Sequence, residues 1–184
     1  MSDDTPSCCQ PVEEKPPPKP RKPPTTWSDY RPLIVLVTFT LLAALSKQLH
    51  YGAGWDGVAW MHDFMGFFLV VFSMFKVCDV SGFADGFQKY DLLASRCRPY
   101  ALAYPFLELV LGLGYLGHWQ PTFIYLATIV LLGFGALGVL RALKRGLDLQ
   151  CACMGTALKV PLTTVALTED LVMVGMAVAM LSVS

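Results

Sequence analysis

Long apolar stretches separated by short polar segments fill the chain from residue 32 onward. Each stretch approaches the roughly 20 residues that an α-helix needs to cross the hydrocarbon core of a bilayer. We predict five transmembrane helices, at about residues 32–49, 57–78, 100–118, 119–141 and 161–183. The expected fold class is therefore all-α, a polytopic membrane helix bundle that occupies residues 31–184.

The fourth and the first of these stretches differ in the length of their charge-free sequence. The fourth, from Trp119 to Leu140, contains no charged residue, so nothing in it resists lipid. The first is short, because charge-free sequence runs only from Pro32 to Ser46 before Lys47. We expect the Lys47 side chain to extend its ammonium group toward the lipid headgroups.

The remaining segments are polar. Residues 1–30 are rich in proline and predict a disordered cytoplasmic tail, because they hold too few apolar side chains to fold. We expect no cleaved signal peptide, since the first apolar run begins only at Leu33. The segment from Phe83 to Arg98 has apolar residues at helical spacing and predicts an interfacial helix.

Composition agrees with a membrane protein: 54% of the residues are apolar and 15% are charged, against about a quarter charged in soluble domains. The lipid bilayer is thus the expected partner. The formal net charge is zero, which argues against binding to nucleic acid.

The distribution of Lys and Arg predicts the orientation, because short cytoplasmic loops collect positive charge. With five spans and a cytoplasmic N-terminus, the C-terminus lies outside and only Lys47 falls on the outer side. We therefore expect a multi-pass protein of the inner cell membrane. The residues expected inside are Lys15, Lys19, Arg21, Lys22, Arg31, Lys89, Arg96, Arg98, Arg141, Lys144, Arg145 and Lys159.

Several motifs resemble one family of small membrane proteins. They are Phe75-Lys76, Gly82-Phe83-Ala84, Tyr104-Pro105-Phe106-Leu107-Glu108 with Gly112, Cys151-Ala152-Cys153-Met154-Gly155, and a last helix that opens Pro161-Leu162 and contains Glu169-Asp170-Leu171. Together they resemble the MauE/DoxX group, and the cysteine element resembles its MauE branch. The resemblance covers residues 57–184 as a four-helix core, to which one extra N-terminal helix is added.

This resemblance implies a role in methylamine utilisation, where MauE-like proteins are associated with disulfide formation in a periplasmic enzyme subunit. The charge distribution along this chain disagrees with that role. It places Cys151 and Cys153 on the cytoplasmic side, away from a periplasmic substrate.

The Cys151/Cys153 pair is the candidate catalytic site. Lys144, Arg145 and Lys159 flank it and favour the thiolate form, which is the reactive one. Clustered cytosolic thiols are more often redox-active or metal-binding than structural. The alternative is a pair of inert loop residues.

Soft-metal binding is a second interpretation of the cysteines. Cys8 and Cys9 in the tail could capture an ion such as Cu(I) and pass it to Cys151 and Cys153. An incidental pair in the tail is an equal alternative. The two further cysteines, Cys78 and Cys97, are expected to be packing or interface residues.

Acidic residues lie within two predicted spans. Glu108 and Glu169 are each eight residues into their helices, with Asp170 next, so matching depths are expected on the cytoplasmic side. Such groups are typical of a proton or cation path. The alternative is a pair that only fixes helix packing, such as Glu108 with Lys76.

His62 and Asp63 lie near the outer end of the second span. A metal site would need more ligands than these, and that side offers only His50 and His118. We therefore expect His62 and Asp63 to hydrogen bond to each other.

Two Gly-x-Gly-x-x-Gly motifs, at residues 112–117 and 133–138, match the dinucleotide-binding fingerprint in letters only. The fingerprint requires a strand-to-helix turn, whereas these motifs lie inside apolar helices. We interpret both as close-packing faces, because small residues let membrane helices approach.

Three functions remain open. The leading hypothesis is thiol–disulfide exchange between Cys151/Cys153 and a cytoplasmic thiol protein in support of redox maturation. We expect no enzymatic activity beyond this exchange. The first alternative is binding or transport of a thiophilic metal ion, with a cytoplasmic metal carrier as partner. The second is a non-catalytic assembly subunit, and an oligomer is compatible with each.

Overall fold

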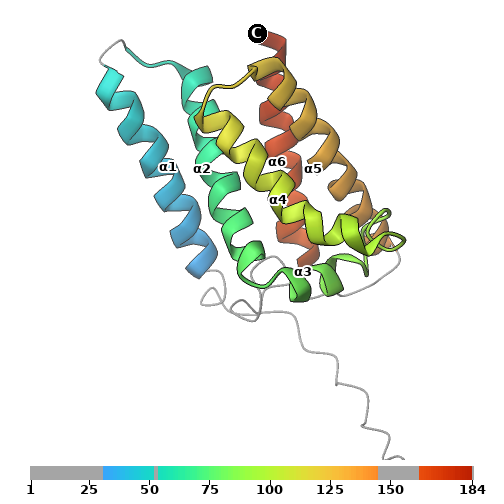
Figure 1. The fold of residues 1–184 in the computed structure, drawn as a ribbon. Helices are drawn as coiled ribbons and strands as arrows, with labels where there is room; N and C mark the ends of the chain where they lie inside the picture. The colour runs from blue at the N-terminus through green and yellow to red at the C-terminus, as the bar shows by residue number, and fades with distance from the viewer. Residues whose placement is uncertain (1–30, 52–53, 145–161, 184) are drawn as a thin grey trace, which may run out of the picture.

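The computed structural model describes residues 31–51, 54–144 and 162–183, and these residues form six α-helices and no strand (Figure 1). Their bounds are α1 Arg31–Tyr51, α2 Gly57–Cys78, α3 Val80–Phe87, α4 Arg98–Leu116, α5 Pro121–Lys144 and α6 Leu162–Val183. The all-α bundle is confirmed.

The five long helices run side by side and alternate in direction, while the short α3 lies across one end (Figure 1). We call this end the α3 face and the other the opposite face. The α3 face holds the starts of α1, α4 and α6 and the ends of α2 and α5. In the middle of the bundle α2 packs against α1 and α4, and α5 packs against α6.

Three of the described helices, α2, α4 and α5, are long and apolar enough to cross a membrane, and α1 contains the shorter apolar stretch Leu33–Leu49. Large apolar side chains such as Phe39, Phe123 and Val130 are exposed on α1 and α5. Exposed apolar surface of this kind suits contact with lipid. The chain is thus a multi-pass membrane protein.

The interior is organised around an aromatic ladder on α2. Phe64, Phe68 and Phe72 are four residues apart and therefore share one helix face. Neighbouring rings in the ladder lie 5.7 Å and 4.2 Å apart between centroids, and each is at most 7% exposed. Met65 on α2 and Tyr115 on α4 complete the contact and are fully buried.

Glycines bring the helices into close contact, as the two Gly-rich motifs predicted. A Cβ added at Gly112 of α4 would lie 2.9 Å from the Val70 backbone nitrogen on α2, so only glycine allows this approach. Gly114 is covered by Ile124 of α5 in the same way, at 2.5 Å. Both motifs lie within helices, so neither can form a strand-to-helix phosphate loop.

The interfacial helix differs from its prediction. α3 begins earlier and ends at Phe87 instead of continuing to Arg98. Asp79 accounts for the start, because its side chain accepts a hydrogen bond from the Gly82 N–H at the helix N-terminus. Beyond the C-cap Gln88, the Asp91 carboxylate accepts hydrogen bonds from the Leu93 and Ala94 N–H groups and caps a separate turn before α4.

Part of the predicted site lies outside the described residues, namely the tail with Cys8 and Cys9 and the segment with Cys151 and Cys153. Of the described cysteines, Cys78 and Cys97 are exposed free thiols at the α3 face. Their exposure contradicts a role in core packing and leaves the expected interface role untested.

Candidate functional site: a buried charged cluster near the α3 face

An ion pair joins α2 to α4 inside the bundle near the α3 face. The Lys76 ammonium donates to both carboxylate oxygens of Glu108, at 2.6 Å each. The two side chains are only 7% and 4% exposed. Glu108 thus pairs with Lys76, as the packing alternative to an ion path named, and its two contacts and burial make it a strong link between the helices.

Aromatic rings enclose this pair. The Lys76 ammonium lies 5.5 Å from the ring centroid of Phe83 and 5.6 Å from that of Tyr104, within cation–π range. Phe83 belongs to α3, which therefore covers the pair from the α3 face. Tyr104 is itself buried, at 3% exposed. Together these contacts keep the charges away from lipid and satisfy them within the protein.

A small cavity of about 30 Å³ connects the pair to α6, enough for a water molecule. Its lining includes Lys76 and Glu108 together with Glu169 and Asp170. The acids of two separate spans therefore meet at one cavity, as the depth argument expected them to lie near each other. The arrangement can hold a proton or bind a cation at the carboxylates of α6.

Gly135 on α5 provides space for one side chain of α4 and one of α6. A Cβ at this position would lie 3.2 Å from the Tyr104 hydroxyl oxygen and 3.5 Å from an Asp170 carboxylate oxygen. The second Gly-rich motif thus serves the polar cluster as well as helix packing. Neither Tyr104 nor Gly135 was predicted as part of the site, although both lie in motifs that the sequence distinguishes.

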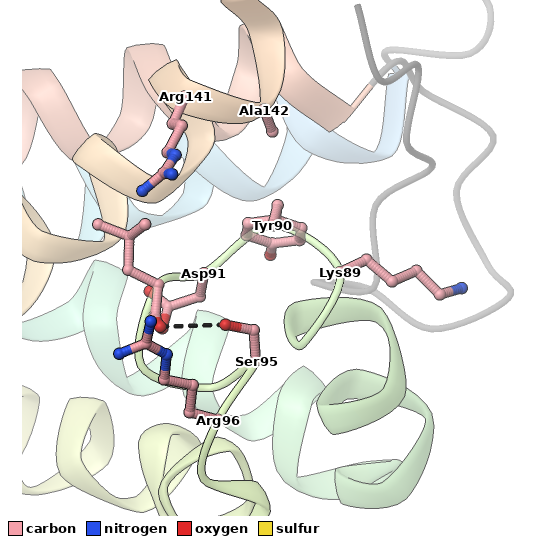
Figure 2. Close-up of a pocket in the computed structure, with 8 residues that line it drawn as sticks. Lys89, Tyr90, Asp91, Ser95, Arg96, Arg141 and Ala142 are labelled. Carbon is pink, nitrogen blue, oxygen red and sulfur yellow. Dashed lines mark hydrogen bonds between the residues drawn. The ribbon is translucent and has the colours of Figure 1, made fainter. Parts of the chain in front are cut away.

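A larger cavity of about 300 Å³ opens at the α3 face between α5 and the loop that precedes α4. Figure 2 shows the guanidinium groups of Arg96 and Arg141 on one side of it, with Lys89 extending away. The residues that line it are Lys89, Tyr90, Asp91, Leu92, Ser95, Arg96, Arg141 and Ala142.

Asp91 is the buried acid of this cavity, at 1% exposed. One carboxylate oxygen accepts hydrogen bonds from the Leu93 and Ala94 N–H groups, and the other has no partner among the described residues. Burial raises the pKa of Asp91 above its ordinary value, more than the two N–H groups lower it. This residue was not predicted, and its only signal is an Asp that precedes a helical turn.

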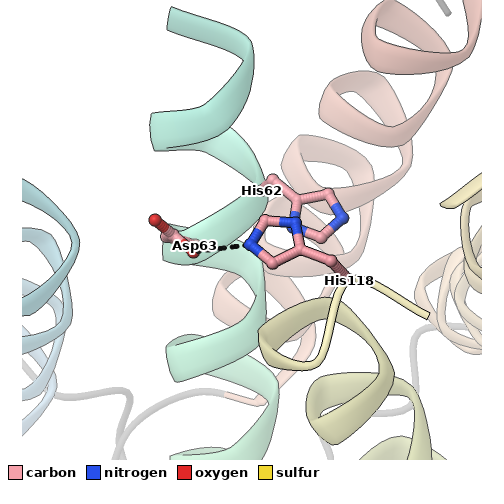
Figure 3. Close-up of side chains that lie close together, drawn as sticks. All are labelled: His62, Asp63 and His118. Carbon is pink, nitrogen blue, oxygen red and sulfur yellow. Dashed lines mark ion pairs between the residues drawn. The ribbon is translucent and has the colours of Figure 1, made fainter. Parts of the chain in front are cut away.

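At the opposite face, His62 and Asp63 of α2 lie beside His118 of the α4–α5 turn (Figure 3). The Lys47 ammonium donates to Asp63 Oδ1 at 2.6 Å, and His118 Nε2 lies 3.8 Å from the same oxygen. Two predictions are therefore wrong. Lys47 turns inward to Asp63 instead of toward headgroups, and Asp63 takes its partner from α1, so His62 is not its hydrogen-bond partner.

Residues 57–183 match the family described as methylamine utilisation protein MauE. The chain belongs to the MauE family. The matched range begins with α2 and ends with α6, so α1 lies outside it, as the resemblance implied. Lys76, Glu108 and Asp170 all fall inside the matched range. No curated protein and no solved structure matches the chain significantly.

Proposed function

We propose that this MauE-family protein supports redox maturation by thiol–disulfide exchange at Cys151 and Cys153. The proposal includes five transmembrane helices with the α3 face in the cytoplasm, so that the C-terminus lies outside. Lys89, Arg96, Arg98 and Lys144 all lie at the α3 face, which supports this orientation through the positive-inside rule.

One observation carries the proposal: α5 ends and α6 begins at the α3 face, beside the buried charged cluster (Figure 1). Residues 145–161, which hold both cysteines, connect Lys144 to Leu162. The segment that holds both thiols thus starts and ends at the face that bears the positive charge, which supports a basic environment for them. A basic environment favours thiolates, which are the attacking species in exchange.

The exchange involves two thiols of this chain and one disulfide of a partner protein. The thiolate of one cysteine attacks a partner sulfur, forms a mixed disulfide and releases the other partner sulfur as a thiolate. The second cysteine, after losing its proton, attacks the mixed disulfide, which gives a Cys151–Cys153 disulfide. Two electrons pass to the partner, and its two sulfurs take up two protons. The reverse direction oxidises a partner dithiol.

Cysteine labelling tests both the chemistry and the sidedness. Maleimide labelling of Cys151 and Cys153 from each side of intact membrane vesicles, before and after oxidant, should show cytoplasmic access and protection by oxidation. Cys151→Ser should trap a mixed disulfide, provided that Cys153 is the attacking thiol, and Cys153→Ser covers the reverse case. The matched control is Cys78→Ser with Cys97→Ser, which removes the exposed thiols of the same face. Labelling that never changes with oxidant or reductant would reject the proposal.

Soft-metal handling is a second candidate, favoured by the convergence of Glu108, Glu169 and Asp170 on one cavity. Carboxylates at this depth could pass a cation from the cysteines into the bundle, although the Lys76 charge opposes it. Serine at Cys151 and Cys153 together with glutamine at Glu169 should then lower cellular metal content or tolerance. Unchanged content and tolerance would reject the candidate. Under the redox proposal, Glu169→Gln leaves thiol exchange intact.

A further inference from the structure

His62 occupies an unusual position for a histidine. The residue is 2% exposed, and neither nitrogen of its imidazole ring has a hydrogen-bond partner among the described residues. Tyr115 and Tyr125 hold the ring through edge contacts, with centroids 4.9 Å and 5.7 Å away. A buried imidazole without partners costs free energy, because it loses its hydrogen bonds to water. A bound ligand would give the His62 nitrogens the partner that the packed side chains do not.

His118 reaches this position from the turn between α4 and α5. Its φ of 50° is in the left-handed region, as is the 42° of Gln120, so two non-glycine residues of one short turn adopt this conformation. Each such residue costs about 1 kcal/mol or more and persists where the surroundings impose it. The turn directs the His118 ring back onto His62, parallel within 2° and 4.5 Å away between centroids (Figure 3).

Asp63 adds a carboxylate to the two imidazoles. One potential ligand atom from each of His62, Asp63 and His118 lies within 4.8 Å of the other two. Two ligands on one tetrahedral zinc ion are roughly 3.3 Å apart, given bonds of about 2.0–2.1 Å. An inward rotation of His118 can make up the difference, because its side chain is 51% exposed.

We propose that His62, Asp63 and His118 bind a divalent transition-metal ion at the opposite face of the bundle. Imidazole with carboxylate is a donor set for borderline ions such as Zn²⁺ and Cu²⁺, unlike the thiolates that select Cu(I). Three protein ligands leave one coordination position open for water or another ligand. The Lys47 ammonium competes for Asp63, and its side chain is 26% exposed and can withdraw toward solvent.

This site is independent of the cysteines and lies at the other end of α2 from Lys76. The sequence offers His118 as one of two further histidines on that side, but it is 55 residues from Asp63, and only the α4–α5 turn brings the two together. The third histidine, His50, is not part of the proposed ligand set and provides a control for nonspecific binding by histidine.

Zinc binding to the full chain in lipid nanodiscs tests the proposal, with all six cysteines changed to serine so that thiolates provide no ligand. A competition titration with Zn²⁺ and a chromophoric chelator should give one ion per chain. His118→Ala should weaken binding at least about tenfold, as should His62→Ala, whereas His50→Ala should not. Equal affinity in His118→Ala, or an equal loss in His50→Ala, would overturn the proposal.

A spectroscopic measurement identifies the ligands directly and does not depend on affinity. Cu²⁺ bound to the same chain should show nitrogen hyperfine coupling from two imidazoles in electron paramagnetic resonance, and from one in His118→Ala. Because His118 lies in an exposed turn, this variant tests the site even if His62→Ala fails to fold. An identical nitrogen pattern in both proteins would exclude His118 as a ligand.

Discussion

Lys76 of α2 and Glu108 of α4 share two hydrogen bonds of 2.6 Å inside the bundle, beneath Phe83 of α3. The two residues are 32 positions apart in the chain. Their contact therefore links two spans of the matched MauE range to each other and to the helix at their end. Its removal should affect assembly of the whole bundle.

Glu108→Gln should destabilise the protein by about 3–5 kcal/mol, because it removes the carboxylate that accepts both hydrogen bonds from the buried Lys76 ammonium. Lys76→Met should cost a similar amount, and the double variant should recover much of the loss. Unfolding in detergent across this double-mutant cycle measures the coupling. Additive losses would show that the two charges do not depend on each other.

Gly135→Ala should destabilise the bundle by about 1–3 kcal/mol, because its Cβ would lie 3.2 Å from the Tyr104 hydroxyl. Gly133→Ala is a matched control on the same helix, since a Cβ there meets nothing within 4 Å. Thermal unfolding of the two variants in the same detergent compares them. Equal melting temperatures would contradict the packing role of Gly135.

Asp91 should make stability depend on pH. Its folded pKa is raised by burial, so the folded state keeps the proton to higher pH than the unfolded chain does. Stability is thus greatest below the unfolded value, falls as pH rises through the raised folded pKa, and then levels off. The N–H groups of Leu93 and Ala94 lower the pKa and limit the size of the effect.

Asp91→Asn should remove this pH dependence while retaining an oxygen for the N–H groups of the capped turn. Denaturant unfolding between pH 4 and pH 8 gives the profile for each protein. Asp85→Asn is the control, because Asp85 is 59% exposed and pairs at the surface with Arg98. A profile that Asp91→Asn leaves unchanged would assign the pH dependence to other groups.

Lys47→Met should destabilise the opposite face by about 1–3 kcal/mol, because Asp63 would lose its 2.6 Å partner while staying buried. Arg98→Met is the matched control, since exposed pairs contribute about 0–1 kcal/mol. Chemical unfolding compares the two. A loss no larger than that of the control would show that Asp63 is satisfied without Lys47.

The helical spans are the part of the fold that apolar run length predicts well. The bounds of α2 agree with the predicted 57–78, because Asp56 caps its start and the apolar run ends at Cys78. Counting residues from the start of each helix was also enough to expect Glu108 and Glu169 near one depth, with Asp170 one residue further. The length of a span and the depth of a residue within it both follow from the helical rise of about 1.5 Å per residue.

Side-chain direction is the part that such reasoning could not predict. Lys47 lies near the end of an apolar run and could face lipid or protein, and only the position of Asp63 on α2 decides between them. The direction of the His118 side chain depends in the same way on a left-handed backbone conformation. A histidine at that position does not predict this conformation. α3 ends at Phe87 and Asp91 caps a separate turn after it, a division that the apolar spacing does not reveal.

The Phe64–Phe68–Phe72 ladder separates the two polar sites along α2, filling about 12 Å of helix with apolar rings. Apolar side chains therefore separate a proton or ion at one end of α2 from the charged groups at the other end. The two ends should therefore respond independently. The stability changes of Glu108→Gln and His118→Ala should add to within about 0.5 kcal/mol, unless an opening of the ladder couples them.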